Sequence, residues 1–258
     1  MSHTFAYKRR KLNFKNIKHV VLDEADRLWD MGFAPDVKYI LRQIKMNYQF
    51  MLFSATLDSD MRNLVKKYTK DTFEFINLSK DEITVGNTLQ FYYLINFYKQ
   101  KYQTFIDVLK REKPDHALVF VNTRKTADWL SRTLKKDGRI NSIVGILSGR
   151  MTQFQREEML KKFRNKQINI LVATDVAARG LDIDDISHVI NYDVPKYPEV
   201  YIHRIGRTSR MNKRGVAITL VLKDEYVYLC NIEGLINKEI KRRETWLQKR
   251  KRKRFTIY

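Results

Sequence analysis

Cysteine and long apolar runs are nearly missing from this sequence. Its single cysteine, Cys230, rules out an intrachain disulfide. That usage is typical of an intracellular protein, cytoplasmic or nuclear. The apolar runs fall well short of the roughly 20 residues that a membrane-spanning helix needs, so we expect no membrane contact. Residues 1–16 are basic and contain no apolar stretch, so we expect no secretory signal there.

Glycine is also scarce. The chain has nine glycines, and none of them is followed by lysine. The usual phosphate-binding loop of nucleotide hydrolases is glycine-rich and ends in Gly-Lys-Ser/Thr, because its backbone N–H groups and its lysine hold the phosphates. The sequence therefore contains no recognisable loop of this kind.

Negative charge is in short supply, with 29 acidic residues against 50 basic ones and a net charge of +21. This balance indicates a polyanionic partner such as a nucleic acid, although a soluble, lysine-rich protein has the same composition. Residues 238–258 are strongly basic around Trp246 and Phe255. We favour a solvated extension for this tail, and the alternative is a phosphate-contacting arm with Trp246 available for stacking.

What the chain does have is an alternation of apolar runs and segments with helical periodicity. Strands that are apolar throughout and separated by helices predict an α/β fold, with a parallel sheet covered by helices on both faces. The expected strands are 17–22, 50–53, 73–76, 89–95, 117–121, 142–147, 168–173, 188–192 and 216–221. The expected helices are 34–44, 58–69 (with Asp58 as N-cap), 99–112, 124–136, 152–165, 198–208 and 224–236.

The alternation falls into two blocks. Residues 79–88 are polar and lack periodicity, so we expect an interdomain linker there. Residues 89–237 contain enough strands and helices for a complete α/β domain. Residues 1–78 have too few strands for a stable sheet of their own, and they resemble the C-terminal part of a domain. Residues 238–258 form the basic tail.

The first chemical signal is an acidic cluster at the end of the strand over 17–22. Asp23 could hold Mg²⁺ directly or through water, and Glu24 could orient and deprotonate an attacking water. Asp26 could couple this site to Ser54 and Thr56, which follow the next strand. The alternatives are a helix N-terminus, where acids favour the positive end of the dipole, and an ordinary turn or cap at 54–56.

The second signal is a set of polar residues in the C-terminal block. Arg207 and Arg210 lie three apart and would share one face of a helix. Two adjacent guanidinium groups repel each other unless an anion lies between them, and a triphosphate suits their planar forks. A basic surface helix is the alternative. The neighbouring polar residues are Thr174, Asp175, Arg179, Gly180, Asp182, His203 and Arg204.

Six short motifs follow one another along the chain: DEAD (23–26), SAT (54–56), FVNTR (120–124), LSGRMTQFQRE (147–157), ATDVAARGLDI (173–183) and HRIGRTSR (203–210). Together they resemble DEAD-box RNA helicases of superfamily 2. They occur in the order and spacing of that family, from about residue 17 to residue 235. The resemblance implies two RecA-like domains joined by a linker, with ATP, Mg²⁺ and RNA bound across the cleft. Residues 1–78 would be the C-terminal part of the first, ATP-binding domain, and 89–237 the second domain.

The resemblance also implies roles for individual residues on the nucleotide side. Asp23 matches the Mg²⁺-associated acid, with the ion held through water, and Glu24 matches the residue that activates the hydrolytic water. Asp182 matches an acid that contacts the ribose. Arg207 and Arg210 match the arginine fingers, which stabilise charge on the transferred phosphoryl group.

Other matches concern coupling and RNA. Residues that link the two domains, or link hydrolysis to unwinding, match Asp26, Ser54, Thr56 and His203. Residues that contact the RNA sugar–phosphate backbone match Gly149, Arg156, Thr174 and Arg124. Backbone contacts of this kind imply little sequence preference. The resemblance further implies a monomer that could act with an accessory protein.

The sequence departs from the family pattern in three places. Ser209 replaces a glycine between the fingers, and Arg150 stands where an acid is more common. Only 22 residues precede Asp23, whereas in the family the Gln motif, the phosphate-binding loop and the first RNA-binding motifs precede this point.

These departures shape the expected function. We expect an ATP-dependent RNA helicase in N-terminally truncated form, with little ATP hydrolysis by this chain alone. The alternative is a non-enzymatic module that binds RNA backbone through the C-terminal domain and the basic tail. A DNA-directed relative from the same superfamily is a third reading.

Overall fold

The computed structural model describes residues 13–30, 32–44, 48–54, 59–69, 72–76, 88–149, 151–178, 186–208 and 215–244. The chain divides into two compact units, Met1–Leu78 and Ser79–Tyr258. Of the expected linker 79–88, only Thr88 lies within the described residues, and it is the first residue of a strand. Within the described part, no helix is long and apolar enough to cross a bilayer.

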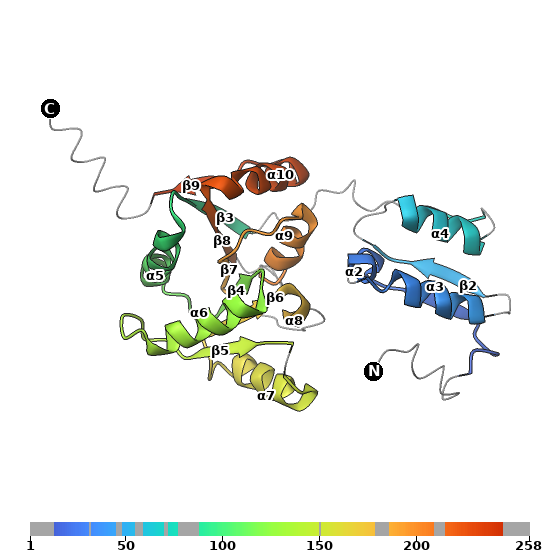
Figure 1. Ribbon diagram of the computed structural model, residues 1–258, viewed down its shortest axis with the longest axis horizontal. Coiled ribbons are helices and arrows are strands. Elements are labelled where there is room, and N and C mark those ends of the chain that lie inside the picture. Colours follow the sequence, from blue (N-terminus) through green and yellow to red (C-terminus); the bar gives the residue numbers. More distant parts are fainter. Residues whose placement is uncertain are drawn as a thin grey trace. The chain divides into compact units, whose positions relative to one another are not determined.

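The first unit is built on two parallel strands, β1 (His19–Leu22) and β2 (Gln49–Leu52). Its helices are α2 (Ala25–Asp30), α3 (Ala34–Gln43) and α4 (Ser59–Thr69). A small core joins Val37 and Leu41 of α3 to Leu64 of α4, with Phe50 and Leu52 of β2 packed against it. Helices α3 and α4 therefore pack on the two-stranded sheet (Figure 1).

The second unit contains a seven-stranded sheet in the order β5-β6-β4-β7-β8-β3-β9, with every pair parallel. Because all the strands run in one direction, all their carboxyl ends lie at the same end of the sheet, which is called its carboxyl edge below. The strands are β3 (Thr88–Ile95), β4 (Ala117–Val121), β5 (Val144–Leu147), β6 (Ile170–Thr174), β7 (His188–Asn191), β8 (Gly215–Leu222) and β9 (Lys241–Arg243).

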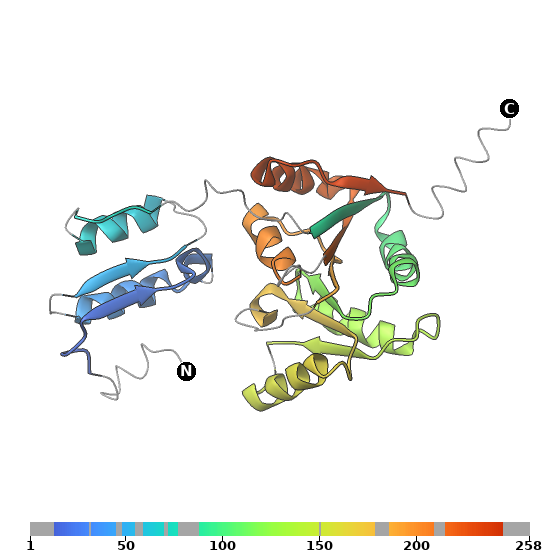
Figure 2. The same cartoon turned by 180° about the vertical axis from the view of Figure 1, so that it is seen from behind.

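Helices cover both faces of this sheet (Figures 1 and 2). In β4, Leu118 and Phe120 join one core cluster while Val119 joins the other, as the two-residue period of a strand requires. The second cluster takes in α5 (Lys101–Glu112) and α6 (Arg124–Lys136). The first takes in α7 (Gln153–Arg164), α8 (Asp175–Ala178), α9 (Pro198–Ile205) and α10 (Tyr226–Ile236). The expected α/β architecture, with a parallel sheet covered on both faces, is confirmed for this unit.

The expected strand at 73–76 was wrong. Residues 72–76 have no regular secondary structure, and Phe75 and Ile76 are 61% and 69% exposed. Within the described part of the first unit, β1 and β2 pair only with each other. An apolar segment becomes a strand only when a neighbouring strand accepts its backbone hydrogen bonds, and residues 72–76 have no such neighbour among the described residues.

The basic tail begins as a strand, which corrects the expectation of a solvated extension for its first residues. Lys241–Arg243 pair in parallel with Phe91–Tyr93 of β3. The Arg243 guanidinium lies 3.3 Å from the Phe91 ring centroid and donates a 2.7 Å hydrogen bond to Glu112. These contacts fix β9 as the outermost strand on one side of the sheet. Residues 245–258 lie outside the described residues.

Gly145 in β5 provides a test of the packing. A Cβ at this position would lie 2.8 Å from Met159 Sδ of α7 and 3.1 Å from two carbons of Ile168. Gly145→Ala is therefore expected to lower the free energy of unfolding by about 1–3 kcal/mol through overpacking, measured by urea denaturation.

Gly234 of α10 is the matched control, because a Cβ there would meet nothing within 4 Å. Gly234→Ala is expected to raise the free energy of unfolding by about 0.5–1 kcal/mol, since alanine favours a helix. Equal stability of Gly145→Ala and the unsubstituted chain would show that α7 is not packed on β5 as described.

Candidate functional site

The acidic cluster of the first unit lies in a tight turn between β1 and α2. Asp23 and Glu24 are both exposed, and the Glu24 N–H donates a 2.9 Å hydrogen bond to Asp23 Oδ1. Glu24 has a φ of 49°, a left-handed conformation that is costly for a residue with a Cβ. Its carbonyl accepts a bond from the Leu28 N–H in α2. The turn thus keeps both carboxylates in solvent at the carboxyl end of the strand.

These carboxylates suit a hydrated Mg²⁺ ion. Mg²⁺ prefers oxygen ligands and keeps several of its waters, so one or two carboxylates are enough to hold it. Among the described residues, no group of three or more His, Cys, Asp or Glu side chains could hold a metal. The donor set of Asp23 and Glu24 therefore fits an ion bound largely through water.

Asp26 and Ser54 are in contact, as the sequence predicts, but through the main chain of Asp26. The buried Asp26 donates its backbone N–H to Ser54 Oγ at 3.1 Å. One residue earlier, the Ala25 N–H donates to the Phe53 carbonyl at 3.0 Å. These bonds join the end of β1 to the end of β2. Asp26 also lies in the first turn of α2, so the alternative of an acidic residue at a helix N-terminus applies to it as well. Thr56 lies outside the described residues.

The second unit is organised around Arg204, which lies on α9 and is 1% exposed. Its Nε and Nη2 donate to the two carboxylate oxygens of Asp175 at 2.7 and 2.8 Å. Its Nη1 donates to Asn191 Oδ1 at 3.2 Å and to the Asp193 carbonyl at 2.7 Å. Its Nη2 also donates to Asn122 Oδ1 at 2.9 Å. All five guanidinium N–H groups therefore have acceptors.

Asp193 extends this network to α5. Its Oδ1 lies 2.6 Å from Lys101 Nζ, and Lys101 is 1% exposed. Its Oδ2 accepts a 2.9 Å bond from the Asn122 N–H. Lys101 Nζ also lies 5.0 Å from the ring centroid of Tyr192, and burial raises the pKa of this tyrosine. The two buried cations are thus both paired, as buried charges must be.

Four positions expected to contact RNA lie near the ends of β4, β5 and β6. Gly149 follows β5, and the Arg124 guanidinium lies 3.3 Å from the place of a Cβ on Gly149, so the two are side by side. Arg124 begins α6, which Thr123 caps by accepting a 3.1 Å bond from the Thr126 N–H. Thr174 ends β6, is 7% exposed, and its Oγ1 accepts from the Ala177 N–H at 3.4 Å. Arg156 lies on α7 and is half-buried.

The expected helix over 198–208 is shorter than the sequence suggests. α9 ends at Ile205, and Arg207 lies in the following turn, where its N–H donates to the Arg204 carbonyl at 3.2 Å. The argument that Arg207 and Arg210 share one helix face is therefore wrong. His203 is half-buried in the last turn of α9. Arg210, Asp182, Arg179 and Gly180 lie outside the described residues.

Comparisons with known proteins agree with these motifs. The family model of the DEAD/DEAH box helicase matches residues 1–64, and that of the helicase conserved C-terminal domain matches residues 100–212. The DEAD-box ATP-dependent RNA helicase CshA of Bacillus cereus is 39% identical over 234 residues, which cover 91% of this chain and 44% of the relative. The chain belongs to the DEAD-box family of RNA helicases.

Further relatives support this assignment. The ATP-dependent RNA helicase FAL1 of Mycosarcoma maydis is 38% identical over 90% of this chain and 58% of its own length. The structure of S. cerevisiae Dbp5 bound to RNA and ADP BeF3 has a TM-score of 0.83 and 30% identity, covering 98% of this chain and 66% of that one. The C-terminal domain of Dbp5 has a TM-score of 0.59 and 32% identity, with 97% of that domain covered. The chain spans about half the length of the curated relatives it matches.

From the sequence alone, no role is assigned to the residues that tie the strand ends of the second unit together. Arg204 and Asp175 were noticed only as neighbours of other residues, and Asn122, Asp193 and Lys101 were assigned no role. One local signal was available, because Arg204 lies in the apolar segment YIHRI. A buried arginine requires acceptors, and the polar residues that follow buried strands were the available acceptors.

The Arg204 network gives a stability prediction. Arg204→Lys keeps the positive charge but loses the planar fork that binds Asp175. It is expected to lower the free energy of unfolding by about 3–5 kcal/mol, because buried acceptors lose their donors, as measured by urea denaturation.

Arg132 offers a matched control on the surface, because it is exposed on α6. Arg132→Lys is expected to change stability little, since substitutions of exposed residues usually change the free energy of unfolding by less than about 0.5 kcal/mol. If the two substitutions were equally mild, the Arg204 network would not be a determinant of the fold.

Proposed function

We propose that this chain functions in ATP-dependent RNA remodelling of the DEAD-box type, and that its second unit supplies contacts to the RNA backbone. One observation carries the proposal. The Arg204 network ties together the ends of β4, β6 and β7, and so positions Arg124 and Thr174 at the same sheet edge as Gly149. The curated relatives are ATP-dependent RNA helicases, and Dbp5 is bound to RNA in its structure.

The chemistry of the RNA positions favours backbone recognition. Arg124 and Arg156 provide guanidinium groups for phosphate oxygens. The Arg124 guanidinium lies where a Cβ on Gly149 would crowd it, so the absence of a side chain at Gly149 leaves room for this group at the strand ends. Thr174 provides a hydroxyl near the end of β6. None of these groups needs a base edge, so we expect little sequence preference.

On the nucleotide side, ATP bound with Mg²⁺ supplies the phosphoanhydride bond whose cleavage releases free energy. Asp23 would hold the ion through water, and Glu24 would orient the attacking water and accept its proton. Arg207, with Arg210, would stabilise negative charge on the phosphoryl oxygens. Asp182 would bind the ribose. The coupling roles would fall to Asp26, Ser54, Thr56 and His203.

We expect the 258-residue chain by itself to hydrolyse little ATP, with or without RNA. The sequence contains no Gly-Lys pair and so no recognisable phosphate-binding loop. In nucleotide hydrolases that have this loop, its backbone N–H groups and its lysine make most of the contacts to the β- and γ-phosphates. The measurement is phosphate release by the purified chain. Robust turnover that disappears in Glu24→Gln, and persists in the exposed control Glu74→Gln, would contradict the prediction.

A second candidate function is RNA binding without catalysis. The observation that favours it is the basic run KRKRKR at 249–254, which follows strand β9. Deleting all of 238–258 would remove β9 and uncover β3, so the truncation is best made after Glu244. A second variant keeps the full length and replaces the six basic residues with glutamine, which separates loss of charge from loss of chain length.

Both variants are expected to bind single-stranded RNA more weakly. The slope of log affinity against log salt should become shallower by roughly 0.7 for each phosphate that the tail no longer neutralises. Fluorescence anisotropy at several salt concentrations measures both quantities, and a DNA strand of the same sequence tests the DNA-directed reading. An unchanged affinity and slope would show that the tail does not contact RNA.

A further inference from the structure

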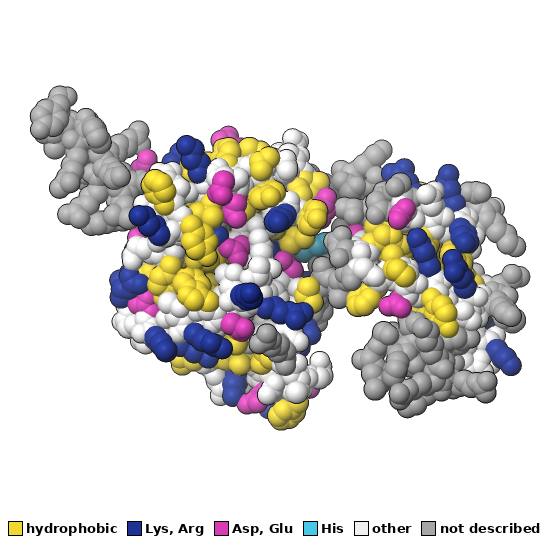
Figure 3. Space-filling model, in the orientation of Figure 1, with side chains coloured by type: hydrophobic (Ala, Val, Ile, Leu, Met, Phe, Trp, Pro, Cys, Tyr) yellow, Lys and Arg dark blue, Asp and Glu magenta, His cyan; other side chains and the backbone are white. Residues whose placement is uncertain are grey.

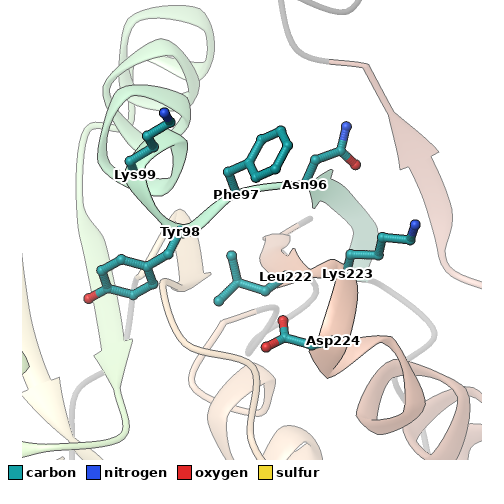
Figure 4. Close-up of a pocket in the computed structure, with 7 residues that line it drawn as sticks. All are labelled: Asn96, Phe97, Tyr98, Lys99, Leu222, Lys223 and Asp224. Carbon is teal, nitrogen blue, oxygen red and sulfur yellow. The ribbon is translucent and has the colours of Figure 1, made fainter.

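An open pocket of about 910 Å³ lies where β3 and β8 end side by side in the second unit. The paired residues Ile95 and Leu222 are the last of the two strands. One wall is the segment after β3 and the other is the segment that starts at the end of β8 (Figure 4). The lining residues are Asn96, Phe97, Tyr98, Lys99, Leu222, Lys223 and Asp224.

Two neighbouring aromatic side chains at this pocket are largely exposed. Phe97 is 60% exposed and Tyr98 is 65% exposed. The backbone is extended at Phe97 and turns into a 3₁₀ helix at Tyr98–Gln100, so the two side chains diverge around the pocket. Figure 4 shows the Leu222 side chain between Tyr98 and Lys223. Adjacent exposed rings beside an aliphatic floor form the kind of surface that marks a binding site.

The charge at the pocket favours an anionic ligand. Lys99 and Lys223 are both exposed and lie on opposite walls, and Asp224 is the one acid among the lining residues. Elsewhere on the visible face, basic side chains are scattered among acidic ones and do not form a single basic patch (Figure 3). Aromatic faces flanked by ammonium groups suit a ligand that is planar and carries phosphates, which describes a nucleotide in a single strand.

The position of the pocket matches the proposed RNA path. The strand order is β4-β7-β8, so the end of β8 lies two strands away from the end of β4, where Arg124 follows. Strands are spaced about 4.8 Å apart, which places the pocket about 10 Å further along the same edge. All of these groups belong to one unit, and an RNA strand that contacts Arg124 could continue along the edge to reach them.

We propose that this pocket is a nucleobase-stacking site. An unpaired base of the bound RNA stacks on the face of one of the two rings, Phe97 or Tyr98, and Lys99 and Lys223 contact the phosphates on either side. This inference rests on the proposed RNA binding and goes beyond it, since the other RNA positions read only the backbone. Stacking tolerates any base, so the site favours single-stranded RNA without selecting a sequence.

The test compares two RNA ligands that carry the same phosphates. One is a labelled oligouridine, and the other is an abasic strand of the same length. The unsubstituted chain is expected to bind oligouridine roughly tenfold more tightly than the abasic strand, as removal of one stacked base implies. The double variant Phe97→Ala/Tyr98→Ala is expected to lose this preference while its affinity for the abasic strand stays unchanged.

The lysines are tested separately. Lys99→Gln/Lys223→Gln is expected to weaken both strands and to reduce the salt slope by roughly 1.4, because two phosphates are no longer neutralised. The controls lie at the opposite edge of the sheet. Ile143→Ala replaces an exposed apolar residue just before β5, and Lys110→Gln replaces an exposed lysine in the last turn of α5. Neither control should change the preference or the slope.

The outcomes separate the two proposals. If the aromatic double variant keeps the preference for oligouridine, the stacking site is wrong, and the pocket is left for a protein partner. If the unsubstituted chain binds both strands equally, backbone binding stands and the stacking site is again wrong. If it binds neither strand, the proposed RNA binding fails, and the stacking site fails with it.

Discussion

A single buried guanidinium governs the geometry of the second unit. Arg204 is 1% exposed, and each of its N–H groups has an acceptor. A charge in this position is tolerated only when its partners are all in place. The acceptors lie at or just after the ends of β4, β6 and β7, so the requirement fixes these three strand ends relative to one another and to α9. Lys101 and Asp193 extend the same constraint to the start of α5.

In the first unit, hydrogen bonds also join strand ends, although fewer residues take part. Bonds from Asp26 to Ser54 and from Ala25 to Phe53 join the ends of two neighbouring parallel strands. In both units, polar residues that follow apolar strands are tied across the sheet edge. Among the described residues proposed to contact ATP or RNA, Asp23, Glu24, Arg124 and Thr174 lie next to these ties, so the ties determine where they can be. Glu24 shows the cost of this arrangement, because its left-handed backbone is held by its neighbours.

Much of this fold could be predicted from local pattern. β4 and β6 are buried along their whole length, and such continuous apolar runs are typical of central parallel strands. The strand β9 could not be predicted, because its sequence KRR is charged and its pairing with Phe91–Tyr93 is distant in sequence. The segment 73–76 has the composition of a strand, yet no described strand pairs with it. The helix predicted over 198–208 from local pattern is also longer than α9, which ends just before Gly206.

The candidate site could likewise be predicted only in part from the sequence. Its motifs point to individual residues, and that assignment rests on resemblance to the DEAD-box family. The network around Arg204 depends on contacts among Asn122, Asp175, Asn191 and Asp193, which no local period encodes. A buried arginine predicts that hydrogen-bond acceptors lie around it, but the sequence does not identify which residues they are. The structure shows that the acceptors lie at the ends of β4, β6 and β7, and the first two of these strand ends also carry Arg124 and Thr174.

The central claim is that the carboxyl ends of β4, β5 and β6 form one RNA-binding edge. It is tested most directly by recording backbone amide NMR shifts of the isotope-labelled chain as a single-stranded RNA is added. The account predicts shifts at the carboxyl edge of the sheet, at Thr123, Arg124, Gly149 and Thr174. It predicts no shifts at the opposite edge, at Lys113 and Asn169. Shifts concentrated at the opposite edge, or none at the carboxyl edge on saturation with RNA, would contradict it.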